Sequence, residues 1–462
     1  MRILLVRPHI GRRETGDYII EGRLEPASLA VLASLGPRDV DYSLVDERME
    51  GISFAAAWDL VAITVETFTA RRAYEIADTF RSLGVPVVLG GLHPSLAPEE
   101  AAPHADSVVV GDAEGVWEGL VEDLRRGRLA PRYRGATPSP PQAGRLPRSD
   151  LYRGKGYLPL AIVQHGRGCR FSCEFCACRV YFGSSWTCRP PQETAAEIAA
   201  RRREGLRNFL FADDNIAMDR GAALELCRAL EPLGIRWGAQ AGIAVARDGE
   251  LLEAAARSGC VGFIIGFESV KAGTLAAMGK GQNLARADSD QARYATELEN
   301  LERAGLAVWG AFTIGHDEDD ARTAAELCDF AKSRRFAFAA FNILVPYLGT
   351  PLYARLAAEG RLLYDGAWWL HPDYRLNDAA FVPARMSPAE LADSCARADR
   401  EFNSIPSILA RCLGGKGPRS PGLRALILSY NLLMRRENRK RDRLPFGYAG
   451  ATSSGTGPGR RR

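Results

Sequence analysis

The 462-residue chain lacks the features of a membrane-spanning, exported or strongly charged protein. No apolar run approaches the ~20 residues that cross a bilayer. The opening segment, MRILLVRPHI, turns polar too soon for a signal peptide. The formal net charge is only +4, from 60 basic and 56 acidic residues, so the chain has no large positive excess for nucleic acid. We therefore expect a folded cytoplasmic protein that binds no nucleic acid, with about three units at roughly 150 residues per domain.

The ten cysteines do not form the dense framework of a small disulfide-bonded protein. Five are scattered and are expected to be small buried side chains: Cys227, Cys260, Cys328, Cys395 and Cys412. The others gather in one short segment: Cys169, Cys173, Cys176, Cys178 and Cys188. This segment is where metal or redox chemistry is expected.

Short apolar runs alternate with helical patterns in the first third of the chain. The runs cover residues 2–8, 41–47, 59–66, 86–91 and 107–112. This alternation predicts a parallel, doubly wound sheet of the flavodoxin type over residues 1–135. Ligands of such sheets bind at the carboxyl ends of the strands. Here those ends carry turns rich in glycine and polar residues: 64–67, 90–95 and 111–115.

A stretch rich in Pro, Gly, Ser and Arg at 131–150 is typical of an extended linker, which we place at 136–157. A second alternating region covers 158–360. Its apolar runs are 158–164, 208–213, 235–241, 261–268, 307–315 and 338–346. Six β/α units predict a partial (β/α)6 barrel with its chemistry on the loops after the strands. We expect a mostly helical region at 361–450 and a disordered tail at 451–462.

The sequence GRGCRFSCEFC, at 166–176, directly follows the first predicted barrel strand. Its spacing, Cys169-x3-Cys173-x2-Cys176, allows three thiolates to converge on one metal centre. The spacing alone is compatible with two kinds of metal centre. A structural zinc would take Cys178 or Cys188 as its fourth ligand. An iron–sulfur cluster on three cysteines would leave one iron free for a small molecule.

This loop, at this position on a barrel, resembles that of the radical SAM superfamily. Members hold a [4Fe–4S] cluster on three cysteines and bind S-adenosylmethionine (SAM) at the open iron. Further segments match in order, namely FADDN, WGAQAG, GFES, GAFTIG and FNILVPYLGTP, the last with Leu348 in place of the usual proline. The resemblance implies SAM contacts from Asp213, Asp214, Gln240, Glu268, Ser269, Gly310, Gly315 and Asn342.

Each of these matches has a structural alternative when it is taken singly. Paired aspartates after a strand often cap a helix, and Glu268 alone could be a solvated turn residue. Together with the cysteine loop, and in order over the barrel, they are improbable as coincidence.

A doubly wound domain ahead of such a barrel resembles the cobalamin-binding radical SAM enzymes. In that group a Gly-Gly-x-His-Pro turn follows the fourth strand, and this chain has GGLHP at 90–94. The residues that the resemblance assigns to cobalamin are Thr64, Thr67, Gly90, Gly91, His93, Ser95, Gly111 and Glu114. No Asp-x-His-x-x-Gly motif is present, and His93 is more readily structural than a cobalt ligand, so we expect cobalamin without histidine ligation. A domain that has lost its cobalamin is the alternative.

The resemblance implies an enzyme that methylates an unactivated carbon through a 5′-deoxyadenosyl radical and methylcobalamin. Oxidative cyclisation or rearrangement without net methylation is one alternative, and a cobalamin and iron–sulfur sensor is another. The expected partners are a hydrophobic or polycyclic small molecule and a reductase, flavodoxin or ferredoxin that donates electrons. Tyr347, after the sixth strand, is a candidate proton donor for which a structural role is equally open.

An apolar stretch from Leu423 to Met434 runs into a basic stretch from Arg435 to Arg443. We favour a packed helix with a solvated basic end. The alternative is peripheral contact with the anionic inner face of a membrane.

Overall fold

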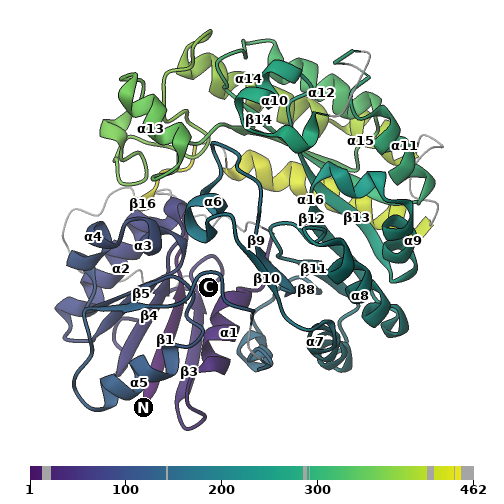
Figure 1. Cartoon of the computed structure of the whole chain (residues 1–462). Helices are drawn as coiled ribbons and strands as arrows, with labels where there is room; N and C mark the ends of the chain where they lie inside the picture. Colours follow the sequence, from purple (N-terminus) through teal and green to yellow (C-terminus); the bar gives the residue numbers. More distant parts are fainter. Residues whose placement is uncertain are drawn as a thin grey trace, which may run out of the picture.

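Two six-stranded parallel sheets organise the chain (Figure 1). This computed structural model describes residues 1–12, 22–141, 144–284, 289–290, 292–413, 421–441 and 443–448. The predicted tail at 451–462 lies outside the described residues.

The first sheet has the strand order β3-β1-β4-β5-β6-β7. Its strands are β1 (Arg2–Arg7), β3 (Asp41–Asp46), β4 (Leu60–Thr64), β5 (Val87–Gly90), β6 (Ser107–Val110) and β7 (Arg132–Arg134). The helices around it are α1 (Ala27–Leu35), α2 (Ala70–Ser82), α3 (Leu92–Leu96), α4 (Pro98–Ala101) and α5 (Trp117–Arg125). Side chains of α2 share one core with the sheet, whereas those of α1 and α5 share the core on its other face. The order of the first five strands and the two covered faces confirm the flavodoxin-like fold.

The sixth strand of this sheet was not predicted. β7 lies in the segment that was interpreted as the start of a linker, and it pairs in parallel with β6. The residues that follow stay on the N-terminal domain, because the Arg145 guanidinium donates to the Ser34 and Leu35 carbonyls. The Arg148 amide likewise donates to the Ala30 carbonyl. This part of the predicted linker is therefore docked, not freely extended.

The second sheet has the order β15-β14-β13-β12-β11-β8, in which sequential strands are neighbours. Its strands are β8 (Leu160–Val163), β11 (Asn208–Phe211), β12 (Arg236–Ala241), β13 (Cys260–Glu268), β14 (Ala307–Ile314) and β15 (Phe338–Ile343). The outer helices are α7 (Pro191–Arg203), α8 (Arg220–Leu230), α9 (Gly249–Arg257), α11 (Ala295–Arg303) and α12 (Thr323–Ser333). The predicted partial barrel is confirmed, with β8 and β15 at its two ends.

Smaller elements surround the carboxyl ends of the barrel strands. They are β9 (Gly166–Gly168), which pairs with β10 (Trp186–Cys188), and the helices α6 (Ala177–Phe182), α10 (Ala272–Ala277) and α13 (Pro351–Ala358). The loop with the three cysteines connects β9 to α6.

The region after residue 360 is less helical than predicted. Its helices are α14 (Pro388–Phe402), α15 (Ile405–Leu413) and α16 (Pro421–Arg441), but residues 361–387 hold only a short 3-10 turn and isolated bridges. This segment returns to the first domain, where Trp368, Trp369 and Tyr374 are buried in the same core as α2. The strand β16 (Gly447–Tyr448) also pairs with β2 (Gly11–Arg12). The C-terminal region therefore packs on both domains.

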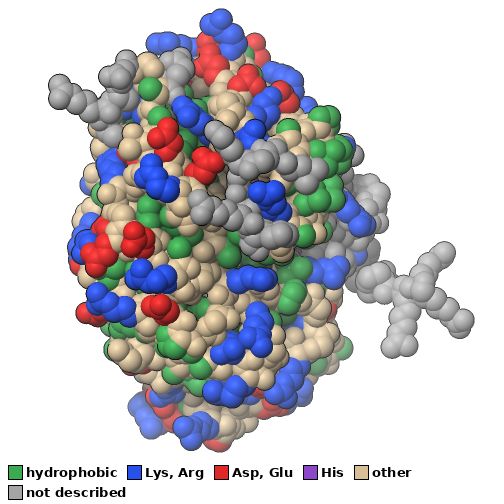
Figure 2. Space-filling view, turned by 90° about the vertical axis from the view of Figure 1, so that its right-hand side faces the viewer, with side chains coloured by type: hydrophobic (Ala, Val, Ile, Leu, Met, Phe, Trp, Pro, Cys, Tyr) green, Lys and Arg blue, Asp and Glu red, His purple; other side chains and the backbone are tan. Residues whose placement is uncertain are grey.

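The helix α16 packs against the barrel through one face, as we favoured from the sequence. Ile427 is buried, and Tyr430 lies edge-on to Phe338 with ring centroids 5.1 Å apart. In Figure 1 the yellow helix lies between the two domains. Among the described residues, no helix has the length and apolar content to span a bilayer. Basic and acidic side chains are interspersed over the face in Figure 2, as the balanced net charge leads one to expect.

Candidate active site

The strand β9 places the cysteine loop at the carboxyl end of β8, where the buried Asp213 and the half-buried Asp214 hold it. The Asp213 carboxylate accepts hydrogen bonds from the amides of His165 and Gly166, at 2.8 and 2.6 Å. Asp214 accepts from the Gly168 amide at 2.8 Å and from the Cys178 thiol at 2.6 Å. Both aspartates therefore fix the segments on either side of the three cysteines. The sequence analysis did not predict this role. Burial raises the pKa of Asp213 to about 7.

Glu174 anchors the far side of the loop. Its carboxylate lies 2.9 Å from His316 Nε2 and 3.2 Å from an Arg355 guanidinium nitrogen. Its backbone amide donates to the Met278 carbonyl, and its carbonyl accepts from the Leu352 amide. The loop is thus clamped by segments after three different barrel strands, none of which the sequence analysis assigned to the site.

The three thiols are within electrostatic reach of one another. Burial, together with the neighbouring Cys176 and Cys173, raises the pKa of Cys169 to about 11. A hydrogen bond with Cys178 lowers the pKa of Cys176, which favours the thiolate that a metal requires. In the part of the chain that the structure describes, no three His, Cys, Asp or Glu side chains are already gathered as metal ligands.

A buried cation compensates the negative charge expected at these thiolates. Lys280 lies 2.5 Å from the Glu268 carboxylate, and both side chains are about nine-tenths buried. Burial lowers the pKa of Lys280, but Glu268, Cys173 and Cys176 outweigh burial and raise it. Three thiols beside a buried ammonium group fit an anionic iron–sulfur cluster. Sequence reasoning missed Lys280.

Glu268 is occupied by contacts within the protein. Besides Lys280, it accepts a hydrogen bond from the Thr313 hydroxyl at 2.5 Å. Its neighbour Ser269 is 2% exposed and caps the next turn by accepting from the Lys271 amide. The structure therefore gives both residues supporting roles, and their predicted contacts with SAM stay predictions.

The alternation of side chains along the barrel strands separates the other predicted SAM residues into two groups. Gln240 and Asn342 are exposed toward the barrel interior. Gly310 faces outward, because a side chain there would lie 2.5 Å from the Phe336 ring. Gly315 has a φ of +117° and lies against Leu391 of α14. In the structure these two glycines serve packing within the protein, and their predicted contacts with SAM stay predictions.

The glycines predicted to approach cobalamin also serve the protein's own packing. A side chain at Gly91 would lie 2.9 Å from the Val65 carbonyl, and one at Gly111 would lie 2.6 Å from the Gly135 carbonyl. Ser95 joins the two turns, since its hydroxyl donates to the Gly91 carbonyl and accepts from the Gly111 amide.

His93 and Glu114 both pair with other residues of the protein. His93 is fully buried and lies 2.8 Å from Glu100 through Nε2, so the structural interpretation of this histidine holds. Glu114 forms an ion pair with Arg167 at 2.7 Å, and Arg167 is also 3.3 Å from Asp112. These pairs connect the edge of the first sheet to β9, just before the cysteine loop.

Three predicted cobalamin residues keep features that suit a ligand. Thr64 and Gly90 are half-buried at the strand ends, and a side chain at Gly90 would meet only ordinary contacts. The Thr67 hydroxyl is buried and has no hydrogen-bond partner among the described residues. Such an unsatisfied group calls for a partner, and a bound cofactor's amide would supply one. This edge of the sheet fits cobalamin at these three residues.

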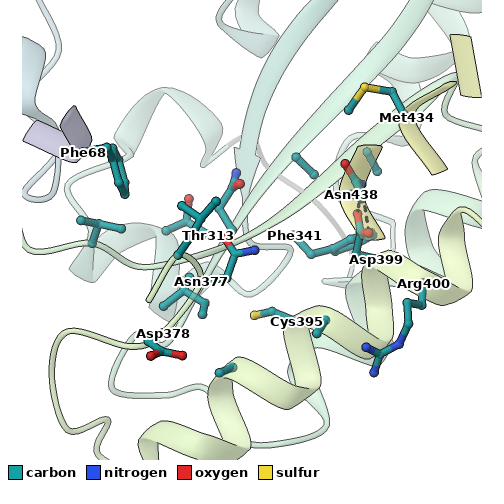
Figure 3. A pocket seen from close by; sticks show the side chains of 18 of the residues that line it. Phe68, Thr313, Phe341, Asn377, Asp378, Cys395, Asp399, Arg400, Met434 and Asn438 are labelled. Atoms are coloured by element: carbon teal, nitrogen blue, oxygen red, sulfur yellow. Dashed lines mark hydrogen bonds between the residues drawn. The ribbon is translucent and has the colours of Figure 1, made fainter. Parts of the chain in front are cut away.

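A cavity of about 740 Å³ lies where the two domains and the C-terminal helices meet (Figure 3). Phe68 reaches it from the first domain, Phe175 from the cysteine loop, and Thr313 and Asn342 from the barrel. Tyr347 also lines it. Burial raises the pKa of Tyr347, and the nearby Glu66 and Cys176 raise it further.

Comparisons with known proteins identify the family. A model described as the radical SAM superfamily matches residues 163–331. A bacteriochlorophyllide d C-12(1)-methyltransferase of Chlorobaculum tepidum is 30% identical over 423 residues, which cover 89% of each chain. The chain belongs to the radical SAM superfamily.

Other relatives extend the likeness of this radical SAM enzyme to both domains. A bacteriochlorophyllide d C-8(2)-methyltransferase of Chlorobaculum tepidum is 30% identical over 356 residues, or 73% of this chain and 77% of that one. The structure of the radical SAM methyltransferase TsrM from Kitasatospora setae, with cobalamin and a [4Fe-4S] cluster bound, superimposes with a TM-score of 0.64. It is 15% identical, and the match covers 95% of this chain and 99% of that one. At this low identity the likeness shows a shared fold. The predicted family, fold class and enzymatic nature are confirmed.

Proposed function

We propose that this enzyme methylates an unactivated carbon of a hydrophobic, polycyclic small molecule, with a [4Fe-4S] cluster, SAM and cobalamin as cofactors. Two relatives that are 30% identical carry the names of methyltransferases that act on bacteriochlorophyllide d. The observation that carries the proposal is the shared cavity. It is bounded at once by the cysteine loop, by the carboxyl edge of the first sheet and by the interior of the barrel.

The bound cofactors supply the radical and the methyl group, and the protein supplies their positions. Cys169, Cys173 and Cys176 would hold the cluster on a loop that Asp213 and Glu174 fix from opposite sides. Gln240 and Asn342 present amides to the barrel interior, where SAM would lie. The aromatic walls of the cavity exclude water from the reacting carbon.

Tyr347 is the cavity residue best placed to hold a proton. Its pKa is raised by burial and by Glu66 and Cys176, so it stays protonated at neutral pH. Its hydroxyl can therefore donate a hydrogen bond to the substrate. We also infer that a flavodoxin or ferredoxin supplies the electron that starts the cycle.

Anaerobic reconstitution of the full-length protein with iron, sulfide and hydroxocobalamin tests this proposal. We expect one four-iron cluster and one retained cobalamin after desalting. With bacteriochlorophyllide d as first substrate, turnover should give both 5′-deoxyadenosine and S-adenosylhomocysteine. The product should also be one methylene group heavier.

Three outcomes separate the alternatives. A cluster without cobalamin would refute the methyl-transfer proposal. Formation of 5′-deoxyadenosine without S-adenosylhomocysteine would favour a cyclase or rearrangement enzyme. If the protein binds the full cluster and cobalamin but does not cleave SAM when the cluster is reduced, a sensor would be favoured. The matched variants Cys176→Ala and Cys188→Ala should lose and keep the cluster, respectively.

A further inference from the structure

The cavity has an apolar body and charged side chains at more than one margin, since Glu66 and Asp378 line it in addition to a charged end at α14 and α16. Aromatic and aliphatic side chains line most of it: Phe68, Phe175, Trp309, Phe341, Tyr347 and Met434. The charged end is built by the last turns of α14 and α16, which contribute Asp399, Arg400, Asn403, Arg435 and Asn438 (Figure 3). A ligand that fills this space would therefore be apolar over most of its length, with a polar group at the end that faces α14 and α16.

The acidic group at this end is already satisfied. The Asp399 carboxylate accepts hydrogen bonds from Asn438 Nδ2 at 2.9 and 3.0 Å, which Figure 3 marks, and from Asn403 Nδ2 at 3.2 Å. Arg435 is also tethered, since its guanidinium donates to the Asn403 carbonyl at 3.0 Å. The Asp399 oxygens are therefore occupied by neutral amides, and the carboxylate keeps its negative charge.

Arg400 is the group without a partner. Its side chain is exposed at the cavity, and no ion pair or hydrogen bond to it is found within the described part of the chain. The guanidinium is always protonated and presents a planar set of donors that matches a carboxylate. Its neighbour Asp399 would disfavour a more highly charged anion. The electrostatic complement of this end is thus a single carboxylate.

We propose that Arg400 binds a carboxylate carried by the substrate, whose flat apolar body lies along the aromatic walls of the cavity. This inference rests on the proposed function, because it treats the occupant of the cavity as the molecule that is methylated. It narrows the substrate to apolar ring systems with an acidic side group. It also assigns Arg400 as the residue that orients the ring toward the cysteine loop.

Binding of a fluorescent probe tests the inference without turnover. The probe is 1-pyrenebutyrate, a flat ring system with one carboxylate, and its methyl ester is the uncharged match. The reconstituted full-length enzyme should quench both and should bind the acid more tightly. Arg400→Gln should weaken binding of the acid about tenfold, the cost of one charge-assisted contact, and leave binding of the ester unchanged.

Arg397→Gln is the matched control. Arg397 lies one turn earlier on α14, is exposed and does not line the cavity, so its replacement should change neither affinity. The inference is overturned if Arg400→Gln leaves binding of the acid intact or weakens acid and ester equally. It is also overturned if neither probe binds. Selective loss of acid binding in an enzyme that never transfers a methyl group would sustain this inference while refuting the proposed function.

Discussion

Replacing Lys280 with Met should destabilise the barrel strongly, because it leaves the Glu268 carboxylate buried without its counter-ion. The two charged groups are 2.5 Å apart, and their side chains are only 11% and 9% exposed. Breaking such a buried pair costs about 3–5 kcal/mol, since the remaining charge keeps its desolvation penalty. Urea unfolding of the cluster-free protein, followed by the fluorescence of tryptophans such as the buried Trp237, measures this loss.

Two further variants separate charge from packing. The double variant Lys280→Met, Glu268→Gln should recover most of the lost stability, because no unpaired charge remains. Lys271→Met removes a partly exposed lysine 3.6 Å from Glu326 and should cost less than about 1 kcal/mol. The reasoning fails if Lys280→Met costs no more than Lys271→Met, or if the double variant is as unstable as the single one.

Three other predictions address the loop, a buried histidine and the C-terminal helix. Alanine at Cys169, Cys173 or Cys176 should abolish iron binding and SAM cleavage, whereas alanine at Cys178 should leave the iron content intact; an essential Cys178 would revive a four-ligand site. Burial, together with the nearby Arg189, lowers the pKa of His165 to about 4, so between pH 6.5 and 4 the unfolded state binds the proton that the native state does not. Stability should therefore fall by about 2 kcal/mol more from pH 7 to pH 5 in the wild type than in His165→Gln, as measured by urea unfolding, and an equal fall in both would contradict this cause. If α16 also touches anionic membranes, vesicles rich in anionic lipid should sediment the full-length protein, and Leu426→Ser with Leu432→Ser on its exposed face should prevent this.

The arrangement of the two domains could be predicted because it depends on local patterns. Buried strands such as β1 and β4 are nearly continuous apolar runs. The amphipathic segment that forms α2 lies between β4 and the next buried strand, β5. The missed strand β7 has no such pattern. Its sequence, RYR, pairs only because β6 offers it a free edge. The mostly helical C-terminal region was overestimated for a similar reason, since nothing local shows that Trp368 and Trp369 are buried under the first sheet.

The candidate site was predictable where one short segment carries the chemistry, and less so where partners come from distant segments. The Cys-x3-Cys-x2-Cys spacing lies within a single loop. The role of Lys280, by contrast, becomes visible only when the fold brings it beside Glu268 and the thiols. Its position between two glycines, in MGKGQN, was a visible signal without an identifiable partner. Gly310 and Gly315 were assigned to SAM by their order in the motif, but the alternation of the strand turns Gly310 outward, and Gly315 lies after the strand, against Leu391.

By itself, the sequence determined the family, the two parallel sheets and the loop on which the cysteines lie, because periodicity and motif spacing are properties of neighbouring residues. Only the tertiary structure decided which matched residues face the cavity and which hold the scaffold. Asp213 and Glu114 form their hydrogen bonds and ion pairs with other parts of the protein, while the Thr67 hydroxyl and the Arg400 guanidinium have no partner in the described structure. That division depends on contacts between segments far apart in the chain, which no local pattern encodes.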